Sequence, residues 1–78
     1  MIAVDTSILT RFYIEDQDDK GARAQRPIAA RVMARPGVFV PKTVLLELVW
    51  VAQALYGFGR AEIAAALYHL YSLANVSI

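Results

Sequence analysis

The apolar positions of the chain form short β-favouring runs that are separated by longer stretches with helical spacing. The β-favouring runs lie at residues 2–4, 38–40 and 76–78, and helical patterns fill the intervals between them. Strands that alternate with helices are typical of parallel βαβ units with right-handed crossovers. We therefore predict an α/β fold with flanking helices and a short parallel sheet, whose strands lie near residues 2–4, 38–40 and 75–78.

Two helical patterns occupy the interval between the first two strands. The first can be capped by Thr6 or Ser7. Its apolar positions recur at helical spacing: Ile8, Leu9, Phe12 and Tyr13. The second spans about residues 20–35, after an acidic stretch at residues 15–19 that we predict to be a loop. Because a proline in a helix interior costs about 3 kcal/mol, the second helix is expected either to kink at Pro27 or to begin there.

Two further helices are predicted between the second and third strands. One is introduced by Pro41 and Thr43, runs to Tyr56 and stops at Gly57. It is apolar nearly all round, which is typical of a helix that is buried or lies in an interface. The other spans about residues 60–73. Its predicted inward stripe consists of Ile63, Leu67, Leu70 and Ala74.

The composition indicates one small domain with a large apolar content. The chain has 78 residues, of which 58% are hydrophobic, and a chain of this length buries only about 60% of its unfolded surface. Apolar surface is therefore expected to stay exposed or to be covered by a partner. The absence of cysteine excludes disulfides and thiolate metal sites, and a net charge of +1 gives no general reason to expect nucleic-acid binding.

No segment of the sequence has the features of a signal peptide or a membrane span. The N-terminal apolar run stops after four residues and is not preceded by basic residues. The longest apolar stretch, at residues 44–58, contains Glu47 and is shorter than the roughly 20 residues that a spanning helix needs. We therefore expect a cytoplasmic protein that does not engage a membrane.

Asp5 is the first candidate functional residue, because it follows a buried strand and precedes a helix. This order puts it at the carboxyl end of a sheet strand, the edge at which open α/β sheets bind ligands. The alternative is that Asp5 serves only as a helix N-cap. From this residue alone, the two interpretations are about equally supported.

Glu47 is the second candidate, because nearly all its helical neighbours are apolar. A charge in such surroundings is costly unless it is paired or binds a metal. A capping box begun by Thr43 does not explain it, since that motif needs its acid at the position of Leu46. A carboxylate at the rim of the helix, reaching water, remains as the alternative. Glu47 closely follows the second strand, so we expect it to share one cleft with Asp5, where two carboxylates can hold Mg²⁺ or Mn²⁺.

Several segments, taken in order, resemble the PIN-domain ribonucleases of the VapC toxin type. The opening MIAVDTSIL is similar to the start of these domains, and FVP at 39–41 with TVLLELVWV at 43–51 is similar to their second block. Tyr56-Gly57, Glu62-Ile63 and Asn75-Val76 match the part that leads to the third strand. The resemblance covers essentially all 78 residues. Its specificity lies in the ordered set of segments, since no single motif is diagnostic.

The resemblance implies a PIN-like three-layer fold and a metal-dependent endoribonuclease, which hydrolyses RNA phosphodiester bonds with metal-activated water. Asp5 and Glu47 fall on the first two acidic positions of the family and would be the metal ligands for Mg²⁺ or Mn²⁺. Thr6 or Ser7 falls where a hydroxyl supports the site. Members of the family are toxins of toxin–antitoxin pairs, so the resemblance also implies an antitoxin partner and a homodimer.

The chain departs from the family pattern in its acids, because the third and fourth family acids lie beyond the third strand. We therefore expect residues 1–78 to be the N-terminal portion of a single PIN domain, truncated after the third strand and poorly active or inactive by itself. The alternative is a catalytically incomplete remnant that acts only by pairing with itself or with an antitoxin.

Other enzyme classes and other candidate residues have weaker support. An aspartyl-nucleophile phosphatase needs a second acid where Ser7 stands, and no glycine-rich phosphate-binding loop is present. His69 has no carboxylate partner within reach in the sequence and is interpreted as structural. One acid-free stretch is interpreted as a solvated helix face, with RNA contact as the alternative: Lys20, Arg23, Arg26, Arg31, Arg35 and Lys42. Tyr56, Tyr68 and Tyr71 are interpreted as core or interface residues.

Overall fold

The fold is an α/β arrangement built on a parallel sheet of three short strands. The computed structural model of the chain describes the backbone of residues 1–14 and 20–78 and the side chains of residues 1–14 and 24–78. The strands β1 (Ile2–Ala3), β2 (Val38–Phe39) and β3 (Val76–Ser77) pair in the order β1-β2-β3, and both pairings are parallel. The predicted parallel sheet is therefore confirmed, with strands shorter than expected.

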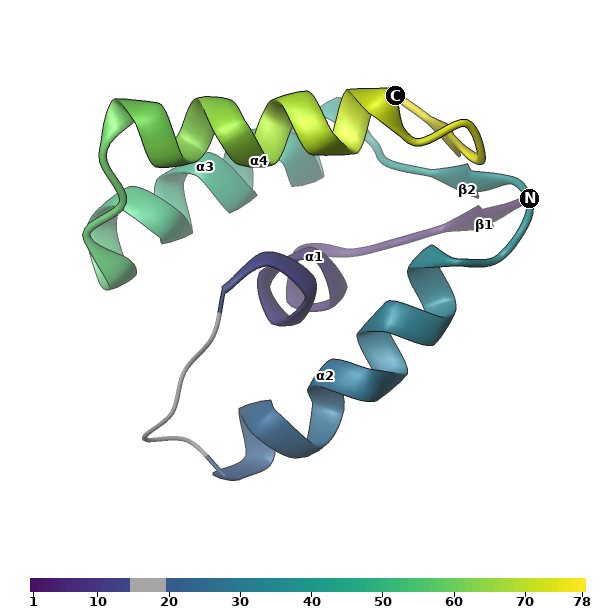
Figure 1. The fold of residues 1–78 in the computed structure, drawn as a ribbon, viewed down its shortest axis with the longest axis horizontal. Coiled ribbons are helices and arrows are strands. Elements are labelled where there is room, and N and C mark those ends of the chain that lie inside the picture. The colour runs from purple at the N-terminus through teal and green to yellow at the C-terminus, as the bar shows by residue number, and fades with distance from the viewer. Residues whose placement is uncertain (15–19) are drawn as a thin grey trace.

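Two helices fill each connection between neighbouring strands. The helices α1 (Thr6–Tyr13) and α2 (Lys20–Met33) lead from β1 to β2, and α3 (Lys42–Tyr56) and α4 (Arg60–Ser72) lead from β2 to β3. Figure 1 shows the strands gathered at one end of the molecule, next to the N-terminus, while the helices fill the rest. The expected loop at residues 15–19 lies outside the described residues.

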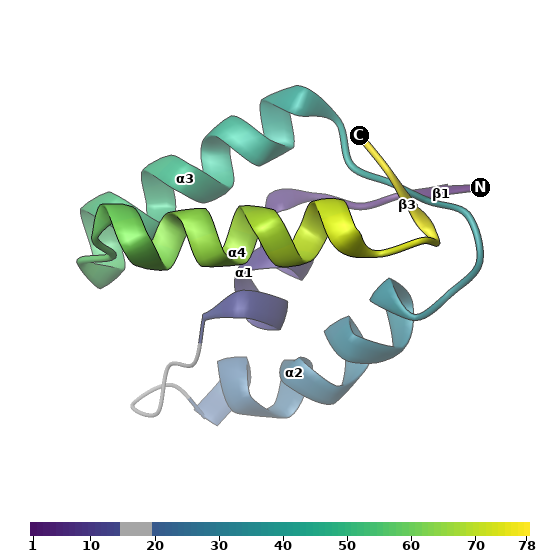
Figure 2. The ribbon, with the colours of Figure 1, turned by 45° about the horizontal axis from the view of Figure 1, so that its top comes forward.

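The two faces of the sheet differ in how well they are covered. Alternate strand residues point to opposite faces. One face contributes to the hydrophobic core, through Ile2, Val4, Val38, Val40, Val76 and Ile78. On the other face Ala3 and Ser77 are exposed and Phe39 is half-buried. The short second strand, although apolar on both sides, is therefore fully buried on one face only. Figure 2 shows β3 returning from the end of α4 to this sheet.

Local sequence signals account for most helix ends, but the expectations for Thr43, Pro27 and Ala74 need correction. Gly57 ends α3 in the left-handed conformation at φ 66°, which favours glycine because it has no Cβ. Thr43 lies inside α3 rather than before it, since the helix begins at Lys42. The helix α2 begins at Lys20 and runs through Pro27, so of the two expectations for this proline a helix start is excluded. Ala74 follows the end of α4 and is exposed, and it is not part of an inward stripe.

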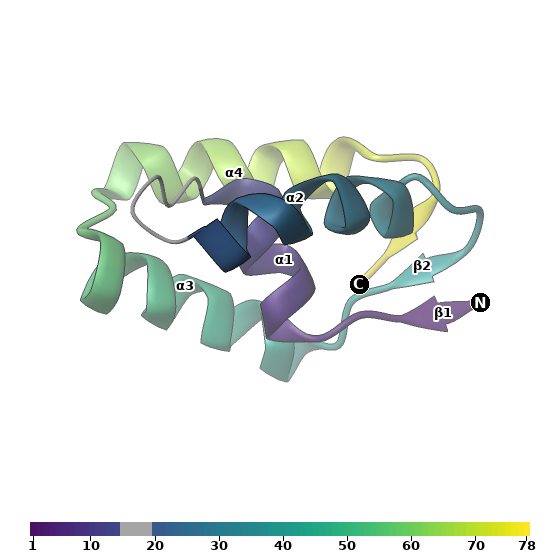
Figure 3. The ribbon, with the colours of Figure 1, turned by 90° about the horizontal axis from the view of Figure 1, so that it is seen from below.

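The core is formed where α1 meets the sheet and the two later helices. Its fully buried large side chains are Leu9, Val38, Val40 and Leu70. Figure 3 shows α1 crossing between α3 and α4. At its end, Tyr13 and Ile14 line an apolar hollow together with Leu48 and Ala52 of α3. Of the two expectations for α3, burial on all sides is wrong, because Leu46, Trp50 and Leu55 remain 70%, 62% and 67% exposed; a role in an interface stays a prediction. None of the helices among the described residues is both long and apolar enough to cross a bilayer.

Candidate functional site

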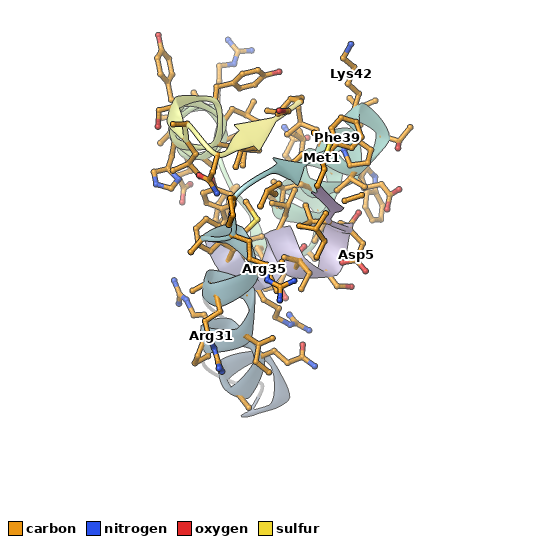
Figure 4. The ribbon with its side chains drawn as sticks, turned by 90° about the vertical axis from the view of Figure 1, so that its right-hand side faces the viewer. Met1, Asp5, Arg31, Arg35, Phe39 and Lys42 are labelled. Carbon is orange, nitrogen blue, oxygen red and sulfur yellow. The ribbon has the colours of Figure 1, made fainter. Side chains whose placement is uncertain are left out.

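Asp5 caps the first helix. Its backbone is extended, and its Oδ1 atom accepts a hydrogen bond of 3.0 Å from the backbone N–H of Ile8. This bond satisfies one of the donors that a helix leaves unpaired at its N-terminus. The interpretation of Asp5 as an N-cap is thus confirmed, whereas Thr6 and Ser7 are the first two residues of the helix and do not cap it. Asp5 is exposed, at the side of the molecule that also carries Lys42 (Figure 4).

Glu47 is joined to the beginning of α1 by a hydrogen bond. The hydroxyl of Thr6 donates to Oε2 of Glu47 over 2.9 Å, although the two residues are 41 positions apart in the chain. Thr6 directly follows Asp5, so this bond brings the Glu47 carboxylate to the end of α1 that Asp5 caps. Glu47 itself is exposed, although it contacts α1. Its exposure agrees with the alternative of a carboxylate at the rim of the helix, so burial of the charge among apolar neighbours gives no argument for a metal.

The structure separates the two hydroxyls that the sequence left equivalent. Thr6 faces α3 and orients Glu47, whereas the exposed Ser7 borders a hollow on the side of α2. The difference follows from helix geometry, because consecutive residues of a helix point in directions about 100° apart. Of the two candidates for the supporting hydroxyl, Thr6 is the one in contact with a predicted metal-site carboxylate.

The two carboxylates offer chemistry that suits a hard divalent cation, but few ligands. Among the described residues, Oδ2 of Asp5 and Oε1 of Glu47 make no hydrogen bond and can serve as oxygen donors. Mg²⁺ is commonly held by one or two carboxylates together with water and substrate phosphates. In the described part of the chain, no three side chains from His, Cys, Asp and Glu gather closely enough to hold a metal ion together. The residues present therefore fit a weak, mostly hydrated Mg²⁺ or Mn²⁺.

A second set of polar side chains, not singled out by the sequence, lies on the side of α1 that faces α2. The Nε–H group of Arg11 donates to Oε1 of Gln25 over 3.2 Å, which joins the two helices. A hollow of about 320 Å³ extends from Asp5 to this pair. The spacing of Ser7, Ile8 and Arg11, three and four residues apart, would have placed these residues on one helix face. No sequence signal indicates that Gln25 is the partner.

His69 belongs to an aromatic cluster between α1 and α4. The hydroxyl of Tyr13 lies 2.9 Å from Nδ1 of His69, and the Phe12 ring packs edge-on to Tyr13 with centroids 4.9 Å apart. Burial disfavours the phenolate and raises the pKa of Tyr13 to about 12, so the hydroxyl stays protonated near neutral pH and can donate to His69. This contact accords with the structural interpretation of His69, and it holds the end of α1 against α4.

The remaining candidates do not form a compact site. Arg31, Arg35 and Lys42 are exposed, which agrees with their interpretation as solvated residues. The side chains of Lys20 and Arg23 lie outside the described residues. Tyr68 and Tyr71 are 81% and 63% exposed, so they are not core residues and an interface role for them stays a prediction, while Tyr56 is half-buried.

Comparisons with known proteins do not assign the chain to a family. No protein-family model matches it, and no curated protein or solved structure shows significant similarity to it.

Proposed function

We propose that this chain carries the first half of the metal site of a PIN-type endoribonuclease, with Asp5 and Glu47 as metal ligands and Thr6 as the residue that orients Glu47. The observation that supports this most is the hydrogen bond of 2.9 Å from Thr6 to Glu47, since it joins two of the positions that the resemblance implies. A cation at the site would activate water and stabilise charge on a phosphate of RNA. The chain's own residues would hold that cation and fix one carboxylate.

A PIN-like three-layer fold is proposed together with this metal site. A PIN-like three-layer fold needs a further layer on the open face of the sheet, where Ala3, Phe39 and Ser77 lie. Among the described strands, β1 pairs on one side only, with β2. We propose that residues 1–78 form the N-terminal portion of one such domain and that the protein acts in the cytoplasm as a toxin held by an antitoxin.

Mn²⁺ binding to the purified chain tests the metal site directly, without requiring activity. We expect Asp5→Asn and Glu47→Gln each to weaken Mn²⁺ binding at least about tenfold in calorimetric titration, because loss of even an outer-shell partner commonly costs that much. Asparagine caps a helix as well as aspartate does, so Asp5→Asn should leave α1 folded.

Glu62→Gln is the matched control, because Oε1 of Glu62 also accepts a backbone N–H at a helix start, that of Gly59 over 2.9 Å. Mn²⁺ affinity that is absent, or that is the same in all three variants, would rule out this metal site.

RNA cleavage by the chain alone is expected to be slow. Mg²⁺-dependent cleavage that Asp5→Asn abolishes would show instead that two acids suffice.

A pairing function is the second candidate, and the exposed side of α3 favours it. Leu46 and Trp50 are 70% and 62% exposed and lie one helical turn apart. Large exposed apolar side chains that adjoin each other are typical of protein interfaces. On this alternative the chain is a catalytically incomplete remnant that forms a homodimer or binds an antitoxin through α3.

Light scattering on the wild-type chain and on Trp50→Glu separates pairing from a monomeric state. We expect the wild type to show a mass above that of one chain at micromolar concentrations and Trp50→Glu to shift toward one chain, since a charge at an apolar interface is costly. Ala30→Glu, which places the same charge on an exposed residue of α2, is the control and should not change the mass. A one-chain mass for the wild type across that range would contradict self-pairing.

A further inference from the structure

The hollow between α1 and α2 has an anionic end and a cationic end. Asp5 borders it at one end, and Arg11 with Gln25 borders it at the other. Ser7 and Ile8 of α1 and Ile28 of α2 line the stretch between them, and Ile28 is 50% exposed. The hollow therefore offers charged groups at both ends and an apolar wall in the middle.

Arg11 is held in place by a bond that uses only one of its donors. The guanidinium has five N–H donors in a planar fork, and its bond to Gln25 uses one of them. Within the described part of the chain, no carboxylate forms an ion pair with Arg11, and the side chain is partly exposed. An arginine that is fixed by a neutral amide, and that pairs with no carboxylate of the described residues, is suited to bind an anion, and its fork matches phosphate oxygens.

A phosphate in this hollow would be repelled by the Asp5 carboxylate unless a cation lies between them. A ligand that binds at both ends of the hollow therefore has one phosphate that contacts a divalent ion at Asp5 and a second negatively charged group that contacts Arg11. A nucleic-acid backbone has such neighbouring phosphates, and Ile8 and Ile28 give apolar contact for a ribose or base. A volume of about 320 Å³ lies at the lower end of ligand pockets and suits one nucleotide of a single strand rather than a duplex.

We propose that Arg11, positioned by Gln25, binds the backbone phosphate of single-stranded RNA that neighbours the phosphate at Asp5. This inference rests on the proposed metal site, since it uses the cation at Asp5 to admit the phosphate that is cut. Arg11 thereby sets the direction in which the strand crosses the site, along α1 from its N-terminus toward its C-terminus. Gln25 acts as a positioning residue, because it contacts Arg11 and not the strand.

RNA affinity measured at several salt concentrations in Mn²⁺ tests the contact. For a labelled single-stranded oligouridylate followed by fluorescence anisotropy, we expect Arg11→Gln to weaken binding roughly five- to tenfold and to lower the salt-dependence slope by about 0.7, as one lost phosphate contact does on a single strand. Gln25→Ala should weaken binding less and leave the slope unchanged, since the arginine keeps its charge. A purely structural role for the Arg11–Gln25 bond would alter thermal stability but not the slope.

Arg31→Gln is the matched control, because it removes the same charge from an exposed arginine of α2, and Arg31 lies away from Asp5 in Figure 4. An Arg11→Gln variant whose affinity and salt slope equal those of Arg31→Gln overturns the inference. If Asp5→Asn still lowers Mn²⁺ affinity in that case, the metal site stands and only the role of Arg11 is lost. If Asp5→Asn leaves Mn²⁺ affinity unchanged, the proposed function fails by a separate measurement.

Discussion

Replacing Leu9 with alanine is expected to destabilise the protein by about 3–5 kcal/mol, the range found when a buried leucine leaves a cavity. Leu9 has no exposed surface and lies on α1, where that helix packs into the core. A chain of 78 residues has a free energy of unfolding of roughly 4–12 kcal/mol, so much of this stability would be lost. Urea denaturation followed by circular dichroism measures the difference.

The matched control for this prediction is Leu55→Ala, the same substitution on a residue that is 67% exposed. Leucine and alanine have similar helix propensities, so the control is expected to change stability by less than about 0.5 kcal/mol. If both variants unfold at the same urea concentration, α1 does not pack as a core helix. The assignment of Asp5 and Thr6 to one end of a fixed helix would then fail as well.

Replacing Asn75 with alanine is expected to cost about 2–3 kcal/mol, because the side chain ties the end of α2 to the sheet. Its Nδ2 group donates to the backbone carbonyls of Met33 and Arg35, over 2.7 and 2.8 Å. The last carbonyls of a helix have no partner within the helix, and one net hydrogen bond is worth about 1 kcal/mol, with a further cost where the abandoned group is buried. The backbone carbonyl of Asn75 also accepts from Val38, so α2, β2 and β3 meet at this residue.

Asn75→Asp distinguishes this role of the side chain from simple space-filling. Aspartate has nearly the same shape but cannot donate, so we expect it to be at least as destabilising as Asn75→Ala in urea denaturation. Ser77→Ala, on the exposed side of β3, is the control and should shift stability by less than about 0.5 kcal/mol. An Asn75→Asp variant as stable as the wild type would show that the two bonds to α2 contribute nothing.

The sequence was most informative where the physics is local. A glycine after an apolar helical run predicts a helix end, and Gly57 ends α3 at the expected place. The periodicity of apolar residues identified the helices and the alternation with short strands, because side-chain direction repeats with a fixed period in each kind of element. At Pro27 the sequence left two outcomes open, and the helix runs through the proline because such propensities are readily overridden by tertiary packing.

The candidate site was predictable only in part, because its residues are local but its contacts are not. The position of Asp5 between a strand and a helix is visible in the sequence, as is its capacity to cap α1. The sequence could not decide whether Thr6 or Ser7 supplies the supporting hydroxyl, since both are adjacent in the chain and carry the same functional group. Tertiary packing made the choice: α3 lies against the side of α1 on which Thr6 points, so Thr6 reaches Glu47.

Contacts between residues far apart in the chain depend on how whole elements pack, and no short-range pattern encodes them. The bonds from Tyr13 to His69 and from Asn75 to Met33 join residues 56 and 42 positions apart. The first bond forms because α1 packs against α4, and the second forms because the turn before β3 meets the end of α2. The sequence by itself determined the kinds of element, their order and the chemistry available at Asp5 and Glu47. Only the tertiary structure decided which face of α3 stays in water, which hydroxyl touches Glu47, and that Arg11 and Gln25 border the hollow beside Asp5.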